Sequence, residues 1–75
     1  MNAKEMFKKL KLNCYDIDYI DDEPIRILYH NNNGTRVNIS KKGIEYTENY
    51  DRNPLPLYFL PAINKQIEEL GWNNE

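Results

Sequence analysis

Cysteine and histidine are the side chains that most often act as nucleophile, general base or metal ligand, and this chain has one of each, Cys14 and His30. A catalytic Cys–His pair needs a third group that orients the histidine and a pocket around the sulfur. A structural zinc site needs several Cys and His ligands. We therefore predict a protein that is not an enzyme, with no catalytic, cofactor-binding or metal-binding residues. Cys14 is expected to fill space where a strand begins, and His30 to face solvent before a turn.

A run of carboxylates after Asn13 is the densest charge feature of the sequence. A calcium loop needs carboxylates at fixed offsets and a glycine at its sharp turn, and no glycine lies between Asn13 and Gly34. The run is then either a solvated strand face with a polar turn, or an acidic patch presented to a basic partner surface. The residues of this acidic patch are Asp16, Asp18, Asp21, Asp22 and Glu23.

A helix is predicted at each end of the chain. Asn2 and Glu5 have the spacing of a capping box, and the first helix ends by Leu12. Its apolar stripe is Ala3, Met6, Phe7 and Leu10. The second helix begins between Leu57 and Pro61, and its apolar positions are Leu60, Ile63, Ile67 and Leu70. Gly71 suits the left-handed position after this helix, where Trp72 would fold back on Ile67.

The middle of the chain predicts short antiparallel strands, because apolar and polar residues alternate with a period of two. The expected strands cover residues 15–19, 25–29 and 35–39, with a less regular fourth at 44–47. Turns are expected at 21–24, 31–34 and 41–43, and residues 48–56 have turn composition only. The phase of the alternation puts four tyrosines on the buried face, namely Tyr15, Tyr19, Tyr29 and Tyr46.

The order α-β-β-β(-β)-α predicts an α+β fold in a single domain spanning residues 1–75. The expected architecture is a small two-layer sandwich, an antiparallel sheet with both helices on one face. With 75 residues the core is thin, so a homodimer that buries a sheet edge is compatible with the sequence.

The charge balance bears on the class of partner. Ten Lys and Arg residues stand against twelve Asp and Glu, a net charge of -2, which disfavours nucleic acid. The element order nevertheless matches the double-stranded-RNA-binding domain, so a nucleic-acid-binding module of that type is the alternative function. No apolar stretch is long enough to span a bilayer and no signal peptide is visible. We expect a cytoplasmic protein without a membrane partner.

The segment from Tyr50 to Phe59 holds more apolar side chains than one helix or strand face can bury. Its prolines stiffen the backbone, so ordering it against a partner loses little entropy. Tyr50, Leu57 and Tyr58 are therefore candidate contact residues. The competing interpretation is that the apolar side chains of this segment complete the thin core.

The two ends of the chain, "NAKEMFKKL" and "AINKQIEELGW", resemble short uncharacterised proteins of phages and prophages of Firmicutes. The match covers Asn2–Leu10 and Ala62–Trp72. This chain differs from those relatives in having Lys11-Leu12 where they have Gly-Tyr, and "NPLPLYFLP" where they have a capped helix start. The resemblance implies a viral gene product acting inside a bacterial host cell, and it carries over no chemistry.

The function predicted from the sequence is that of a non-enzymatic phage or prophage accessory protein that binds another protein. The partner would be a host or defence-system component, which includes the case of an anti-CRISPR-like inhibitor.

Overall fold

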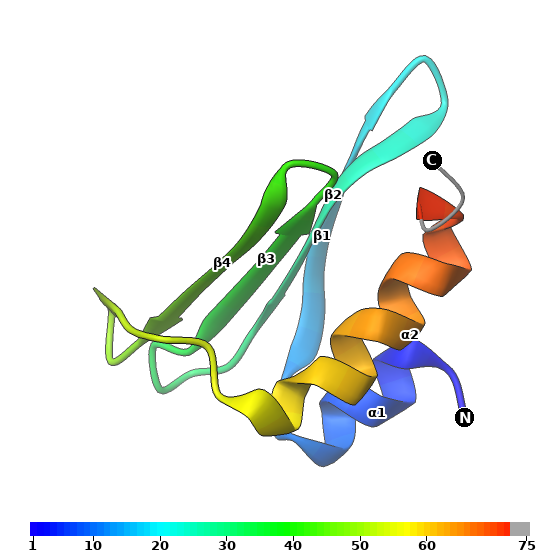
Figure 1. Ribbon diagram of the computed structural model, residues 1–75. Coiled ribbons are helices and arrows are strands. Elements are labelled where there is room, and N and C mark those ends of the chain that lie inside the picture. Colours follow the sequence, from blue (N-terminus) through cyan, green and yellow to red (C-terminus); the bar gives the residue numbers. More distant parts are fainter. Residues whose placement is uncertain (73–75) are drawn as a thin grey trace.

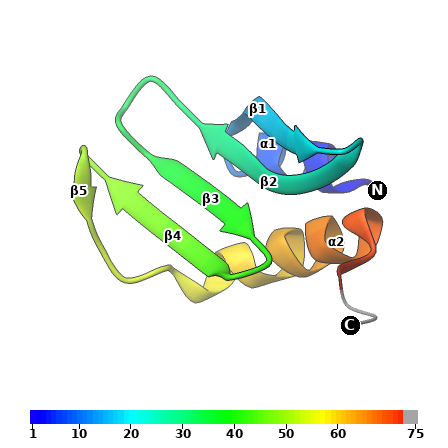
Figure 2. The same ribbon diagram turned by 90° about the horizontal axis from the view of Figure 1, so that it is seen from above.

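The computed structural model describes residues 1–72 and confirms the predicted fold class (Figure 1). Five antiparallel strands form one sheet whose spatial order β1-β2-β3-β4-β5 repeats the sequence order. Both helices cover the same face of this sheet (Figures 1 and 2). The elements are α1 (Ala3–Lys9), β1 (Asn13–Ile20), β2 (Glu23–His30), β3 (Arg36–Ser40), β4 (Gly43–Glu48), β5 (Asp51–Arg52), the 3-10 turn η1 (Leu57–Phe59) and α2 (Leu60–Leu70).

The predicted capping box starts α1. The Glu5 backbone N–H donates to Asn2 Oδ1 at 2.8 Å, and the Asn2 N–H donates to Glu5 Oε1 at 3.0 Å. The helix ends at Lys9, before Leu12, because Lys11 takes the left-handed conformation with φ 69°. The left-handed conformation of Lys11 changes the direction of the chain and places the Leu12 side chain in the core, where it is fully buried.

The predicted phase of the first strand is confirmed at Ile17 but wrong at Tyr15, because β1 contains a bulge there. Cys14 pairs with Tyr29 and Asp16 with Leu28, so Tyr15 is an extra residue in β1 that faces away from the helices. A bulge shifts the side-chain alternation by one. Tyr15 is therefore exposed, whereas Cys14 and Ile17 pack against the core.

Tyr19 is also exposed, contrary to the prediction, and it lies beyond a second irregularity of the hairpin. Asp18 pairs with Arg26 but Tyr19 pairs with Pro24, which leaves Ile25 as the extra residue in β2. Beyond this bulge the β1–β2 hairpin projects past the helices (Figure 1), and Tyr19 is 58% exposed there. The proline is tolerated in the strand because the bulge already interrupts the ladder.

The core lies between the central strands and the two helices. Tyr29 on β2 and Tyr46 on β4 are buried as predicted. Both are paired with Val37 of β3, the strand that lies between them. The Phe7 ring of α1 stacks on Tyr29 with ring centroids 3.9 Å apart. These contacts fix the helix pair against the sheet.

The C-terminal half differs from the prediction in two places. Residues 51 and 52 form the short strand β5, although no alternation marked them, because the Asn49-Tyr50 turn folds them back onto β4. Within α2, Leu60 is exposed and the preceding Phe59 is buried instead. Gly71 ends α2 at φ 76°, as predicted, and half-buried Trp72 lines the same hollow as Ile67.

Candidate functional site

The predicted contact residues lie in three separate places. Leu57 and Tyr58 are on η1, Tyr50 is in the turn between β4 and β5, and the acidic patch is on the β1–β2 hairpin. Leu57 and Tyr58 are neighbours, but neither Tyr50 nor the acidic patch lies on the same element, so the predicted residues do not form one site.

The exposure of Leu57 and Tyr58 follows from the proline-rich segment before them. Pro56 is extended, and its carbonyl oxygen accepts a hydrogen bond from the Phe59 N–H at 3.1 Å, which closes the η1 turn. The Phe59 ring enters the core beside Tyr46, with centroids 5.5 Å apart. Leu57 and Tyr58 then point outward and are 79% and 61% exposed.

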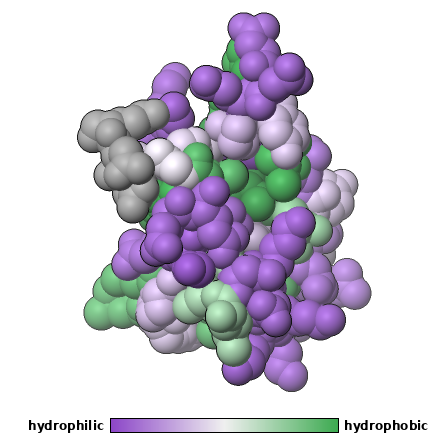
Figure 3. All heavy atoms as spheres, turned by 90° about the vertical axis from the view of Figure 1, so that its right-hand side faces the viewer, coloured by the Kyte–Doolittle hydropathy of each residue, from purple (hydrophilic) through white to green (hydrophobic). Residues whose placement is uncertain are grey.

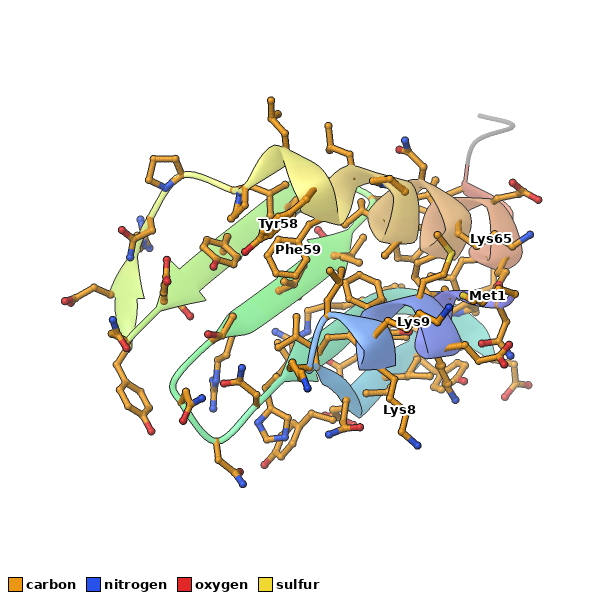
Figure 4. All side chains as sticks on the ribbon, turned by 90° about the horizontal axis from the view of Figure 1, so that it is seen from below. Met1, Lys8, Lys9, Tyr58, Phe59 and Lys65 are labelled. Atoms are coloured by element: carbon orange, nitrogen blue, oxygen red, sulfur yellow. The ribbon has the colours of Figure 1, made fainter. Side chains whose placement is uncertain are left out.

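An apolar groove adjoins Tyr58, between α1 and the start of α2 (Figure 4). It has a volume of about 190 Å³ and is lined by Met1, Met6, Lys9, Leu10, Tyr58, Pro61 and Ala62. Met6 and Leu10 were assigned to the apolar stripe of the first helix, but both are only half-buried. The stripe contains more apolar residues than the sheet covers, and this excess is the signal that could have indicated the groove.

Helix α1 is rich in lysine, and one of its lysines lines the groove. Lys4, Lys8, Lys9 and Lys11 are exposed, and Lys9 itself lines the groove. Figure 4 shows Lys9 on α1 and Lys65 on α2, whereas the side chain of Lys8 points away from α2. Lys65 Nζ lies 3.4 Å from Glu68 Oε1, an exposed pair in which the charges are weakly coupled. The groove is therefore apolar, with Lys9 as the charged residue in its lining.

The acidic patch occupies the opposite end of the sheet. Asp21 and Asp22 form its turn with φ values of 51° and 66°, and Asp18 forms an ion pair with Arg26. Ile20 is 59% exposed beside these carboxylates. Figure 3 shows a hydrophilic surface at the tip of the hairpin and hydrophobic residues gathered beneath it, towards the helices.

Tyr50 has a structural contact of its own. Its backbone N–H donates to the Gly34 carbonyl at 3.1 Å, and its ring lies against the Gly34 α-carbon. The side chain is still 79% exposed, so Tyr50 braces the 31–35 loop while most of its ring faces solvent.

Cys14 and His30 lie on adjacent strands but on opposite faces of the sheet. Cys14 faces the core, whereas the His30 ring packs edge-on against Tyr15, with centroids 4.3 Å apart. Within residues 1–72 there is no cluster of three His, Cys, Asp or Glu residues that could hold a metal ion. The two residues therefore do not form a nucleophile–base pair.

A hollow of about 540 Å³ lies beside the hairpin and is lined by Ile20, Ile25, Arg26 and the residues around Lys42. Its Arg26 is already paired with Asp18, so this hollow presents no unsatisfied arginine to an anion. No helix in the described residues 1–72 has the length and apolar character needed to cross a membrane.

Comparison with known proteins gives no family for the chain, since it matches no protein-family model, no curated protein and no solved structure. The functional argument consequently depends on the surfaces described above.

Proposed function

We propose that this chain is a small non-enzymatic protein that acts by binding another protein. The observation that supports it is the pair of exposed side chains on η1, Leu57 and Tyr58, next to the apolar groove. We call these two residues and the groove the interaction surface.

Several properties of this surface are those of protein contact sites. Tyrosine is enriched among the residues that contribute most to binding, and a large apolar side chain left in water gains free energy when a partner covers it. Pro54 and Pro56 restrict the backbone before η1, so little conformational entropy is lost on binding. Met1 and Met6 in the groove are flexible apolar side chains that adapt to different partner shapes.

The charge distribution favours a protein partner over the alternative of duplex RNA. A basic last helix is the feature by which the double-stranded-RNA-binding module would dock on phosphates. Here α2 carries Lys65 together with Glu68 and Glu69, and the hairpin at the far end of the sheet is acidic. The lysines of α1 alone give no continuous basic face.

The proposed setting is the cytoplasm of a bacterial cell carrying a phage or prophage, with a host or defence-system protein as partner. The resemblance of the two chain ends to phage proteins supports this setting.

Affinity capture tests the function. The wild-type chain is immobilised and exposed to lysate of a Firmicute host, and captured proteins are quantified against the double variant Leu57→Ala/Tyr58→Ala. We expect capture of a specific partner to fall at least tenfold, which corresponds to about 1.4 kcal/mol. Tyr15→Ala is the matched control, because Tyr15 is exposed to a similar degree but lies on the other face of the sheet. Capture that both variants retain would contradict the interaction surface.

A further inference from the structure

Asn33 and Gly34 follow one another in the loop of residues 31–35, between β2 and β3. In an Asn-Gly sequence the glycine nitrogen is able to attack the amide carbon of the asparagine side chain, because glycine has no β-carbon to hinder the approach. The attack needs a glycine N–H that no hydrogen bond holds, and an asparagine side chain that water reaches. This loop meets both conditions.

The N–H group of Gly34 has no hydrogen-bond partner among residues 1–72, although Gly34 is buried. The N–H groups on either side of it are held, because those of Asn33 and Thr35 both donate to Oδ1 of Asn31, at 2.8 Å and 3.2 Å. Nearly all buried N–H groups in folded proteins are paired, so the unpaired one at Gly34 is unusual. The Asn33 side chain is exposed to water. No hydrogen bond within the described residues therefore restrains the nitrogen that would attack.

The packing around position 34 requires a glycine. Its φ of 80° is in the left-handed region, and a β-carbon there would lie 2.7 Å from Cδ2 of the Tyr50 ring. A larger residue at this position would slow the attack on Asn33, but it would also overlap with Tyr50. The contact with Tyr50 therefore keeps the residue that makes Asn33 reactive.

Two other exposed asparagines outside the helices lack this combination. Asn53 precedes Pro54, whose nitrogen carries no hydrogen. Asn49 precedes Tyr50, whose N–H donates to the Gly34 carbonyl at 3.1 Å. These two asparagines serve as internal controls for the reactivity of Asn33.

We propose that Asn33 is a site of spontaneous deamidation. The Gly34 nitrogen forms a bond to Cγ of Asn33, the bond from Cγ to the side-chain nitrogen breaks, and ammonia leaves with the proton of the Gly34 N–H. The product is a five-membered succinimide ring. Water, the only other reactant, then opens the ring at one of its two carbonyl carbons, which gives aspartate or isoaspartate at position 33. The proposal goes beyond the proposed function, because it concerns a covalent change in the chain itself.

The isoaspartate product should loosen the 31–35 loop. In isoaspartate the main chain runs through the side-chain carbons, which lengthens it by one methylene group. Two hydrogen bonds hold the loop at its present length, from the Asn31 N–H to the Thr35 carbonyl at 3.1 Å and from the Tyr50 N–H to the Gly34 carbonyl at 3.1 Å. An additional methylene group between Asn31 and Thr35 disturbs this geometry, so we expect the isoaspartate form to melt at a lower temperature.

Incubation of the folded chain at pH 7 and pH 9, followed by tryptic digestion and mass spectrometry, tests the proposal. Trypsin releases Asn33 in the peptide 27–36, Asn49 in the peptide 43–52 and Asn53 in the peptide 53–65, and fragmentation assigns the modified position. Of these three residues we expect only Asn33 to change from amide to acid, and faster at pH 9, because base removes the N–H proton. Its rate should be at least a tenth of that in a synthetic peptide 27–36. The unfolded fraction of a stable domain is too small to account for such a rate.

Two variants serve as matched controls. Asn33→Gln keeps the amide but would have to close a less favourable six-membered ring, so its peptide 27–36 should stay unmodified at position 33. Asn33→Asp has the charge of the product without the additional methylene group, and it should melt above the converted chain isolated by ion exchange.

A rate at Asn33 below a tenth of that in the synthetic peptide would overturn the proposal, and so would conversion of Asn49 as fast as of Asn33. Equal melting temperatures for Asn33→Asp and the converted chain would contradict the loosening of the loop.

Discussion

The hydroxyl group of Tyr29 on β2 donates a hydrogen bond to Oε1 of Gln66 on α2, and both side chains are buried. Within residues 1–72, Gln66 is the one polar side chain in the core. The Phe7 ring covers the other side of Tyr29, so α1, β2 and α2 all meet at this tyrosine.

Removal of one partner of this hydrogen bond should destabilise the fold. A buried polar group left without its partner costs about 1–3 kcal/mol, so Tyr29→Phe and Gln66→Leu should each lower the free energy of unfolding by about that amount. The double variant should lose less than the sum, because no polar group is then left unpaired. Urea unfolding of the four proteins measures this coupling, and strictly additive losses would contradict it.

The same hydroxyl makes stability sensitive to alkaline pH. Burial raises the pKa of Tyr29 above its ordinary value near 10, and the charges of Cys14 and Glu69 raise it further. Above pH 10 the unfolded chain loses this proton while the folded chain keeps it, so the stabilisation present below pH 10 is lost as the pH rises. Urea unfolding between pH 8 and 11 should show this decline. It should be less steep in Tyr29→Phe than in the wild type, and equal slopes would exclude Tyr29 as the cause.

Gly34 and Gly71 provide a matched pair of substitutions. Their φ values are 80° and 76°, so alanine should cause a similar backbone strain of about 1–2 kcal/mol at either position. Space is open around Gly71, whereas a β-carbon at Gly34 would lie 2.7 Å from Cδ2 of the Tyr50 ring and 2.9 Å from the Tyr50 nitrogen. Gly34→Ala should therefore lower the melting temperature more than Gly71→Ala.

The Tyr50 ring accounts for part of that excess. Tyr50→Ala in the Gly34→Ala background should recover some stability, because it removes the overlapping ring atoms but leaves the backbone contact. Equal melting temperatures for the two single glycine variants would show that Tyr50 does not crowd Gly34.

The hairpin turn offers a stabilising substitution. Asp21 and Asp22 both have positive φ, the geometry of a type I′ turn, for which Asp-Gly is a preferred sequence. Asp22→Gly should raise the free energy of unfolding by about 0.5–1 kcal/mol, as measured by thermal or urea unfolding. The control Asp22→Asn removes the same charge without the freedom of glycine and should gain less.

Trp72 should contribute less to the free energy of unfolding than a fully buried tryptophan would. It is half-buried, where it packs against the core beyond the end of α2. Loss of a fully buried aromatic side chain costs about 3–5 kcal/mol, so we expect Trp72→Ala to cost about 1–3 kcal/mol. An unchanged unfolding curve would show that the indole contributes no packing.

Local signals in the sequence were sufficient for the order of the helices and of β1 to β4, but not for β5. The capping box of Asn2 and Glu5, the alternation in β2 and β3 and the glycine after α2 are each encoded within a few residues. A meander also needs no long-range choice of partner, because each strand pairs with the next.

The exposure of Tyr15 and Tyr19 could not be predicted in the same way. For Tyr15 it depends on a bulge, which results from the pairing of two strands and is not recorded in the alternation of either one. For Tyr19 it depends on how far the hairpin projects past the helices (Figure 1). The groove was missed for a related reason. Met6 and Leu10 have the spacing of buried residues, but the packing of α1 against α2 leaves both only half-buried.

The agreement between sheet order and sequence order has a kinetic consequence. Hairpins between neighbouring strands close short loops, which costs little chain entropy and gives a low contact order. The pairing of the chain ends is the exception, as in the hydrogen bond from the Ala3 N–H to Glu69 Oε2 at 2.8 Å. The β-meander should therefore assemble early in refolding, and the docking of α1 against α2 should follow the main barrier. Substitutions in the contact between α1 and α2 would then accelerate unfolding and leave the refolding rate nearly unchanged.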